Sequence, residues 1–150
     1  TSHICTQRAN FARKDINLTT DVIVGFPGET EEEFSETVEF LKKCGFSKLN
    51  VFPFSARKGT VAYSMKNQID EPIKKERVNA LLDLSRDFES EYKQAYNHQI
   101  LDFLIESYDE ESKTFIAHSS NFIESHIPYN SKIHVGDTLN IEYIFDNVKN

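Results

Sequence analysis

The chain has 150 residues, of which 39% are apolar and 27% charged, and this ordinary balance indicates a globular chain and argues against disorder. No run approaches the roughly 20 apolar residues of a membrane span, and no signal-peptide pattern is present, so a cytoplasmic location is expected. The net charge of -7 is uneven, because residues 97–150 carry 3 basic against 9 acidic side chains. This part therefore lacks the basic surface that binds nucleic acid non-specifically.

The first 17 residues are polar and show no sustained period. The Val-Ile-Val run at 22–24 is β-branched and too short for a helix, which predicts a buried parallel strand. Gly25 and Gly28 follow, and glycine lets the backbone turn tightly and approach a ligand. Because ligands of α/β folds bind at the carboxyl ends of the strands, this turn is the first candidate site.

A helix is predicted directly after the turn. Thr30 and Glu33 have the spacing of a capping box, and Gly45 can supply the left-handed stop. Its apolar positions recur at helical spacing and include Cys44, which we interpret as a small core residue. Residues 46–54 then form a second apolar run, which predicts the neighbouring strand of the same sheet and hence a βαβ unit.

The segment after the second strand has no period and predicts a loop containing Arg57 and Lys58, at the same rim as Gly25. Asp70 can cap a second helix of about 26 residues. The apolar stripe predicted for this helix consists of Ile73, Val78, Leu81, Leu82, Phe88, Tyr92 and Ala95.

From Asn97 onward the apolar period changes to two. Short alternating runs, separated by acidic and Asn/Ser-rich turns, predict strands near 101–105, 114–117, 122–127 and 139–145. Strands of this length suggest a small β-barrel or sandwich. We therefore predict an α/β domain at 1–96 and an all-β domain at 97–150, joined by the long helix.

Three segments carry a family resemblance: DVIVGFPGETEEEF, GFSKLNVFPFSARKGT and IKKERVNALLDLS. They resemble the closing part of the radical S-adenosylmethionine methylthiotransferases, and KLNVFPFSARKGT is most similar to the enzymes acting on threonylcarbamoyladenosine in tRNA. Residues 97–150 resemble the family's TRAM domain, with HSSNFIESHI as the best match. The resemblance covers residues 17 to about 145.

The resemblance implies an α/β fold that forms the carboxy-terminal part of a partial TIM-like barrel, followed by a small TRAM-like β-barrel. It places S-adenosylmethionine at the rim formed by Val24, Gly25, Phe52, Pro53 and Phe54. The physical requirement agrees, since an adenine ring needs a flat apolar slot with backbone groups at its edge.

The resemblance also makes Arg57 a candidate for substrate phosphate or a cofactor carboxylate, as a two-pronged donor, with a solvated loop charge as the equal alternative. His118 and Asn121 are candidates to touch RNA, and a simple polar turn is the alternative there. The histidines lack a close ligand spacing such as HExxH, so no metal ligand is predicted.

One departure from the family concerns its iron-sulfur clusters. The parent enzymes use two 4Fe-4S clusters, and their motif CxxxCxxC is absent here, where only Cys5 and Cys44 occur. Two cysteines cannot supply three thiolates to such a cluster. We therefore expect a carboxy-terminal fragment that contains no catalytic residue and is inactive alone.

The implied function is that of a tRNA-modifying transferase. It would add a methylthio group to C2 of N6-threonylcarbamoyladenosine at position 37, with tRNA as partner and neither DNA nor a membrane. One alternative is a sister methylthiotransferase acting on isopentenyladenosine tRNA or on a ribosomal protein. Another is a non-catalytic RNA-binding module.

Overall fold

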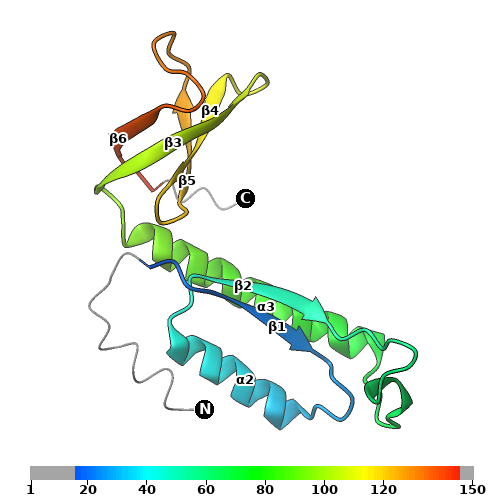
Figure 1. Cartoon of the computed structure of the whole chain (residues 1–150). Coiled ribbons are helices and arrows are strands. Elements are labelled where there is room, and N and C mark those ends of the chain that lie inside the picture. Colours follow the sequence, from blue (N-terminus) through cyan, green and yellow to red (C-terminus); the bar gives the residue numbers. More distant parts are fainter. Residues whose placement is uncertain (1–15, 146–150) are drawn as a thin grey trace. The chain divides into compact units, whose positions relative to one another are not determined.

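The computed structural model describes residues 16–145 of the chain (Figure 1). They form two compact units, one of residues 18–89 and one of residues 90–145 together with residues 16 and 17. The division falls within a long helix, α3 (Glu71–Gln94), that belongs to both. The predicted domain boundary after residue 96 stays a prediction.

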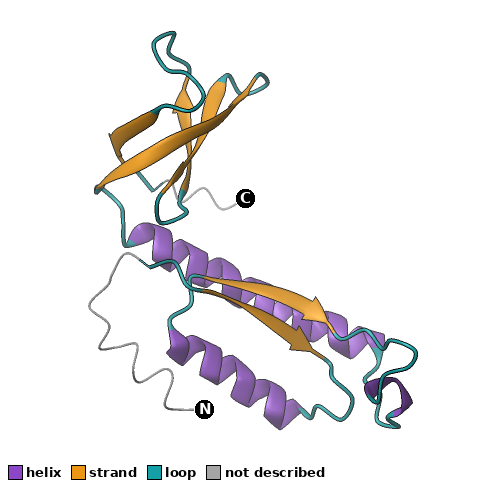
Figure 2. Cartoon of the chain, in the orientation of Figure 1, coloured by secondary structure: helices purple, strands orange, loops and turns teal. Residues whose placement is uncertain are grey.

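The first unit contains a parallel strand pair connected by a helix (Figure 2). Its elements are β1 (Thr19–Val24), α2 (Glu31–Cys44), β2 (Lys48–Pro53), the short 3-10 helix η1 (Ala62–Ser64) and the greater part of α3. β1 and β2 pair from Thr19 opposite Lys48 to Val24 opposite Pro53. The predicted strand-helix-strand unit is therefore confirmed. A partial TIM-like barrel stays a prediction, because the described residues of the first unit form a sheet of only two parallel strands.

The capping residues predicted for α2 are confirmed. The backbone N–H of Glu33 donates to the Thr30 hydroxyl at 3.2 Å, and the N–H of Thr30 donates to the Glu33 carboxylate at 2.9 Å. These two bonds satisfy N–H groups that the first helical turn leaves without partners. At the other end Gly45 has a φ of 65°, in the left-handed region that glycine adopts without steric cost.

One face of the strand pair is covered by the two helices. Val24 and Leu49 point to this face, where they pack with a buried cluster from α2 and α3 made of Phe34, Leu41, Leu81 and Phe88. Ile23 and Phe52 point to the opposite face and are 61% and 51% exposed. The alternation of side chains along each strand thus leaves one face of the pair open.

The apolar stripe predicted for α3 is wrong at three positions, one of which is Ala95, an exposed residue just beyond the end of the helix. Ile73 and Leu82 are 41% and 38% exposed, whereas the buried side chains of this helix are Lys74, Arg77, Leu81, Ser85 and Phe88. Three of these five are polar: Arg77 and Ser85 bond to the turn after β1 and to β2, and Lys74 pairs with Glu71 while its stem packs under Gly25. Ser85, for example, accepts from the Leu49 N–H at 2.9 Å and donates to the Leu49 carbonyl at 3.3 Å.

The second unit is a curled antiparallel sheet, as Figure 1 shows. Its strands are β3 (Ile100–Asp109), β4 (Thr114–Ser119), β5 (Glu124–Pro128) and β6 (Thr138–Glu142), in the order β5-β4-β3-β6. Phe103 and Ile105 alternate into a core with Tyr96, Phe115, Ala117, Ile123, Ile127 and Tyr143. The predicted period of two is confirmed, and the curled sheet is compatible with a small β-barrel. Within residues 16–145, none of the helices has the length and apolarity to cross a bilayer.

Candidate functional site

The ends of β1 and β2, predicted to form one rim, lie side by side. The backbone N–H of Phe54 donates to the carbonyl of Val24 at 2.7 Å, directly after the register pair of Val24 and Pro53. The Val24 side chain is fully buried in the core, and its carbonyl is occupied by this bond. An apolar wall for a ligand therefore has to come from side chains other than Val24. The cofactor-binding role of the predicted rim, Val24, Gly25, Phe52, Pro53 and Phe54, stays a prediction.

The open face of the strand pair supplies such a wall. Ile23 and Phe52 are direct cross-strand partners, and the adjacent outward pair is Asp21 and Asn50. The Asn50 amide donates to Asp21 Oδ1 at 2.8 Å. An apolar pair thus borders a hydrogen-bonded polar pair. The continuous apolar run at 22–24 predicted a buried strand, which is wrong for Ile23 because the pair has an open face, and so sequence reasoning missed Ile23, Asp21 and Asn50.

The glycine turn after β1 presents an aromatic ring at the same end. Gly25 and Gly28 have φ angles of 77° and 89°, which only glycine adopts easily. The N–H of Glu29 closes the turn on the Phe26 carbonyl at 2.9 Å. The Phe26 ring remains partly exposed and meets Phe54 edge to face, with 5.1 Å between ring centroids. Phe26 therefore joins the apolar rim, although sequence reasoning had not assigned it a role.

A buried ion pair lies beneath this turn. Glu29 Oε2 accepts from the Gly25 N–H at 2.7 Å and from Arg77 Nη1 at 2.6 Å. Arg77 is only 5% exposed; its Nη2 lies 3.2 Å from Glu31 Oε2, and its Cζ lies 5.2 Å from the Phe34 ring centroid. Removing one partner of a buried pair is costly, because the other charge stays buried without compensation. The pair therefore ties the turn to α3.

Lys74, one turn earlier on α3, packs under Gly25. Its Nζ pairs with Glu71 at 2.8 Å and lies 5.9 Å from the Phe54 ring centroid. A Cβ on Gly25 would come within 2.5 Å of Lys74 Cγ. Sequence reasoning missed Lys74 and Arg77 because lysine and arginine on a helix ordinarily face solvent.

Arg57 is exposed in the loop after β2. Its carbonyl accepts from the backbone N–H of Thr60 at 3.2 Å and from the Thr60 hydroxyl at 2.8 Å. These bonds shape the loop and leave the guanidinium at the surface. The role predicted for Arg57 in substrate binding stays a prediction.

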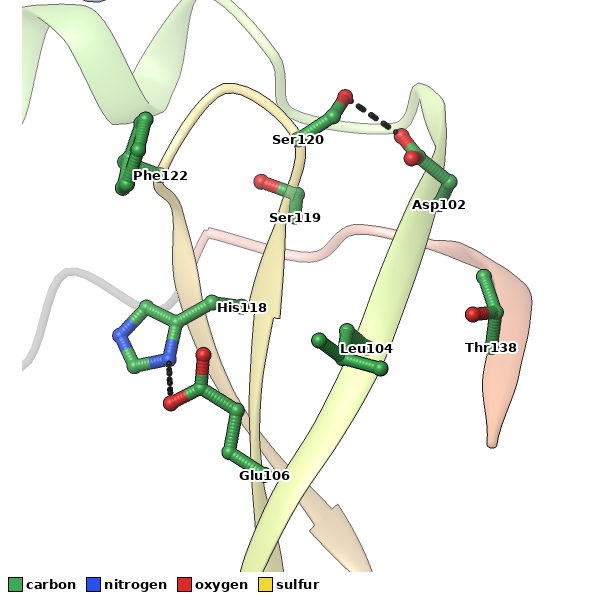
Figure 3. A pocket seen from close by; sticks show the side chains of 8 residues that line it. All are labelled: Asp102, Leu104, Glu106, His118, Ser119, Ser120, Phe122 and Thr138. Carbon is green, nitrogen blue, oxygen red and sulfur yellow. Dashed lines mark hydrogen bonds and ion pairs between the residues drawn. The ribbon is translucent and has the colours of Figure 1, made fainter. Parts of the chain in front are cut away.

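The second unit carries a cavity of about 480 Å³ on the outer face of its curled sheet (Figure 3). The Ser120 hydroxyl donates to Asp102 Oδ1 at 2.8 Å at one end of it. The lining combines carboxylates, hydroxyls, one imidazole and two apolar side chains, contributed by Asp102, Leu104, Glu106, His118, Ser119, Ser120, Phe122 and Thr138. This set can accept hydrogen bonds and offer an apolar surface, but it contains no cation for a phosphate.

His118 lines one side of this cavity, next to Glu106 (Figure 3). Its Nδ1 lies 3.1 Å from Glu106 Oε2 and its Nε2 lies 3.3 Å from Glu124 Oε2. The register of β3 against β4 shifts between Ile105 and Ser107, and Glu106 is the extra residue in this bulge. Although these side chains cluster, residues 16–145 contain no group of three or more His, Cys, Asp or Glu that could hold a metal ion.

Asn121 is buried in the turn between β4 and β5. Its backbone carbonyl accepts from the Tyr92 hydroxyl at 3.0 Å and from the Asn17 amide at 3.1 Å, and its side-chain oxygen accepts from Ser119. The next residue, Phe122, is 77% exposed with a φ of 62°. The strand predicted to begin at Phe122 therefore begins only at Glu124. The RNA contacts predicted for His118 and Asn121 stay predictions, and the burial of Asn121 favours support of the turn.

The homologues of this chain are tRNA methylthiotransferases. A threonylcarbamoyladenosine tRNA methylthiotransferase of Bacillus subtilis is 46% identical over 110 residues, which are 71% of this chain and 24% of that enzyme. A tRNA-2-methylthio-N(6)-dimethylallyladenosine synthase of Caldicellulosiruptor saccharolyticus is 35% identical over 135 residues, or 90% of this chain and 27% of that enzyme.

A synthase of the same name from Alkaliphilus oremlandii is 44% identical over 92 residues, or 61% of this chain and 20% of that enzyme. The chain thus spans about a quarter of the length of the curated relatives it matches. No protein-family model matches the chain.

Proposed function

We propose that this chain forms the carboxy-terminal part of a radical S-adenosylmethionine methylthiotransferase. The enzyme adds a methylthio group to C2 of N6-threonylcarbamoyladenosine at position 37 of tRNA. In this proposal the first unit supplies one wall of the S-adenosylmethionine site, and the second unit contacts tRNA.

The observation that carries the proposal is the shared end of β1 and β2. The bond from Phe54 to Val24 holds the two strand ends together, and Ile23 and Phe52 form an exposed apolar pair beside them. A flat purine requires a surface of this kind. The similarity to tRNA methylthiotransferases supports the same assignment.

The residues present fit the adenosyl part of S-adenosylmethionine. When bound, S-adenosylmethionine would supply the methyl group from its sulfonium. Phe26, Phe52 and Ile23 offer exposed apolar surface, and Asn50 and Asp21 offer polar groups next to it. An iron-sulfur cluster does not fit this chain, because two cysteines cannot provide three thiolates. Cluster ligation is therefore assigned to other parts of the enzyme.

The tRNA contact we propose for the second unit is with bases. Asp102, Glu106 and Glu124 repel phosphates, whereas the exposed Phe122 ring offers a stacking surface. Carboxylates also accept hydrogen bonds from the amino groups of bases. His118 lines the cavity between Glu106 and Glu124, and its imidazole can hydrogen-bond a base, so it is the side chain we assign to RNA there. Phosphate contact is left to Arg57, which is exposed in the first unit.

Nucleoside analysis of tRNA tests the assignment directly. Cells that lack the gene containing this chain are expected to lose the 2-methylthio derivative of threonylcarbamoyladenosine and to keep that of isopentenyladenosine. Restoring the gene should restore the lost nucleoside. Loss of the isopentenyl derivative alone would instead support the first alternative.

That alternative is a sister methylthiotransferase, and it is favoured by the names of two relatives cited above, which are dimethylallyladenosine synthases. A sister enzyme acting on a ribosomal protein would leave both nucleosides unchanged. The modified residue would then be found by mass spectrometry of ribosomal proteins from the same cells.

A non-catalytic RNA-binding module is the remaining alternative. The acidic excess of residues 97–150 predicts weak affinity of the 150-residue chain for tRNA at physiological salt. Filter binding or fluorescence anisotropy with purified tRNA measures this affinity. Tight binding by the chain alone would favour the binding module over a part of an enzyme.

A further inference from the structure

Glu29 contacts three parts of the first unit: Gly25 at the end of β1, Phe26 in the turn that follows, and Arg77 on α3. Its carboxylate accepts the Gly25 N–H at 2.7 Å and the Arg77 guanidinium at 2.6 Å, and its own carbonyl accepts from the same guanidinium at 3.2 Å. Its N–H closes the turn on Phe26. One residue therefore fixes both ends of the glycine turn and ties them to α3.

We propose that Glu29 is a positioning residue for the ligand at the end of β1. Its carboxylate, held by Arg77, sets the conformation of the turn at 25–28 and hence the place of the Phe26 ring. The identity of the ligand, the adenosyl group of S-adenosylmethionine, rests on the function proposed above. The conformational role of Glu29 rests on its contacts alone.

The burial of the pair explains why the turn needs this residue. Arg77 is almost fully buried, and the Glu29 side chain is 15% exposed, so water competes little for either group. Gly25 is itself buried, and its N–H would lack a charged acceptor without Glu29. Charge-assisted hydrogen bonds to such an amide are stronger than neutral ones. A neutral side chain at 29 would therefore loosen the turn while β1 and β2 remain paired.

Two variants separate charge from shape. Glu29→Gln keeps an oxygen that can accept the Gly25 N–H but removes the charge facing Arg77. Glu29→Asp keeps the charge and shortens the reach by one methylene group. Glu32→Gln is the matched control, because Glu32 is an exposed carboxylate of the same segment.

Hydrogen exchange in the 150-residue chain measures the conformational role without any cofactor. Exchange of the Gly25 amide, followed by NMR, is expected to accelerate at least tenfold in Glu29→Gln and to stay within twofold in Glu32→Gln. Amides of Val22 and Phe52, within the strand pair, should keep their rates. An unchanged Gly25 rate in Glu29→Gln would overturn the proposal.

The functional consequence is measured in cells whose only copy of the gene carries the variant. Glu29→Gln is expected to reduce the methylthio nucleoside at least fivefold per amount of folded protein, and Glu32→Gln to leave it unchanged. Val38→Ala, which weakens the packing of the same unit away from the turn, controls for stability. An equal loss of the nucleoside in Val38→Ala at equal loss of stability would reduce Glu29 to a structural residue.

The two proposals fail in different ways. A wild-type gene that restores no methylthio nucleoside overturns the proposed function and leaves the exchange result standing. A wild-type gene that restores it, together with a fully active Glu29→Gln variant, overturns the positioning role alone.

Discussion

The backbone N–H of Phe54 and the carbonyl of Val24 are joined at 2.7 Å, just beyond the last paired residues of β1 and β2. This bond brings the glycine turn that follows β1 and the loop that follows β2 to one end of the strand pair. The contact between the Phe26 and Phe54 rings depends on this arrangement, because the two rings follow strands that end at the same level.

Replacing Gly25 with alanine is expected to destabilise the first unit by about 2–3 kcal/mol. The residue has a positive φ, and the added Cβ would lie 2.5 Å from Lys74 Cγ. Gly28→Ala is the control, since its φ is also positive but nothing lies within 4 Å of its Cβ position. It should cost about 1 kcal/mol. Urea unfolding measures both, and equal losses would show that contact with Lys74 does not matter.

Adjacent leucines on α3 should respond very differently to truncation. Leu81 is fully buried, so Leu81→Ala is expected to lower the free energy of unfolding by about 2–5 kcal/mol. Leu82 is 38% exposed, and Leu82→Ala should cost less than about 1 kcal/mol. Chemical denaturation of the two variants compares them directly. A larger loss for Leu82 would mean that Leu82, and not Leu81, faces the core.

Phe122→Gly is expected to raise the stability of the second unit by up to about 1 kcal/mol. A phenylalanine in the left-handed region is strained by roughly 1–2 kcal/mol, and the flexibility of glycine in the unfolded chain offsets part of that gain. The ring is mostly exposed, so little packing is lost. Thermal unfolding tests the stability, and the methylthio nucleoside in cells should fall. A destabilised Phe122→Gly variant would instead indicate that the ring packs onto the fold.

Tyr143 should make stability fall in alkaline solution. Burial raises its pKa above the ordinary value of 10.0, because the phenolate is poorly solvated in the core. The raised pKa contributes stability that is fully present below pH 10 and is lost as the pH rises through the folded-state value. The difference in unfolding free energy between the wild type and Tyr143→Phe, measured from pH 8 upward, isolates this group. A difference that is independent of pH would contradict the prediction.

Much of the local structure could be predicted from residue patterns. The capping box of Thr30 and Glu33, the stop at Gly45 and the alternation of Phe103 and Ile105 all depend on neighbours within a few residues. The charged side chains that α3 buries could not be predicted in this way. Arg77 is buried because Glu29, distant in sequence, supplies its partner, and Lys74 is buried because its side chain packs under Gly25 near the Phe54 ring.

The sequence by itself determined the order of the two long helices and the six strands, the shared rim after the first two strands, and the family that the chain resembles. Local sterics and the spacing of apolar side chains set these features within short segments. Only the tertiary structure decided that Val24 turns inward while Ile23 and Phe52 form the open wall, and that Glu29 binds both Gly25 and Arg77. These relationships depend on strand register and helix rotation, which are fixed when the whole unit packs.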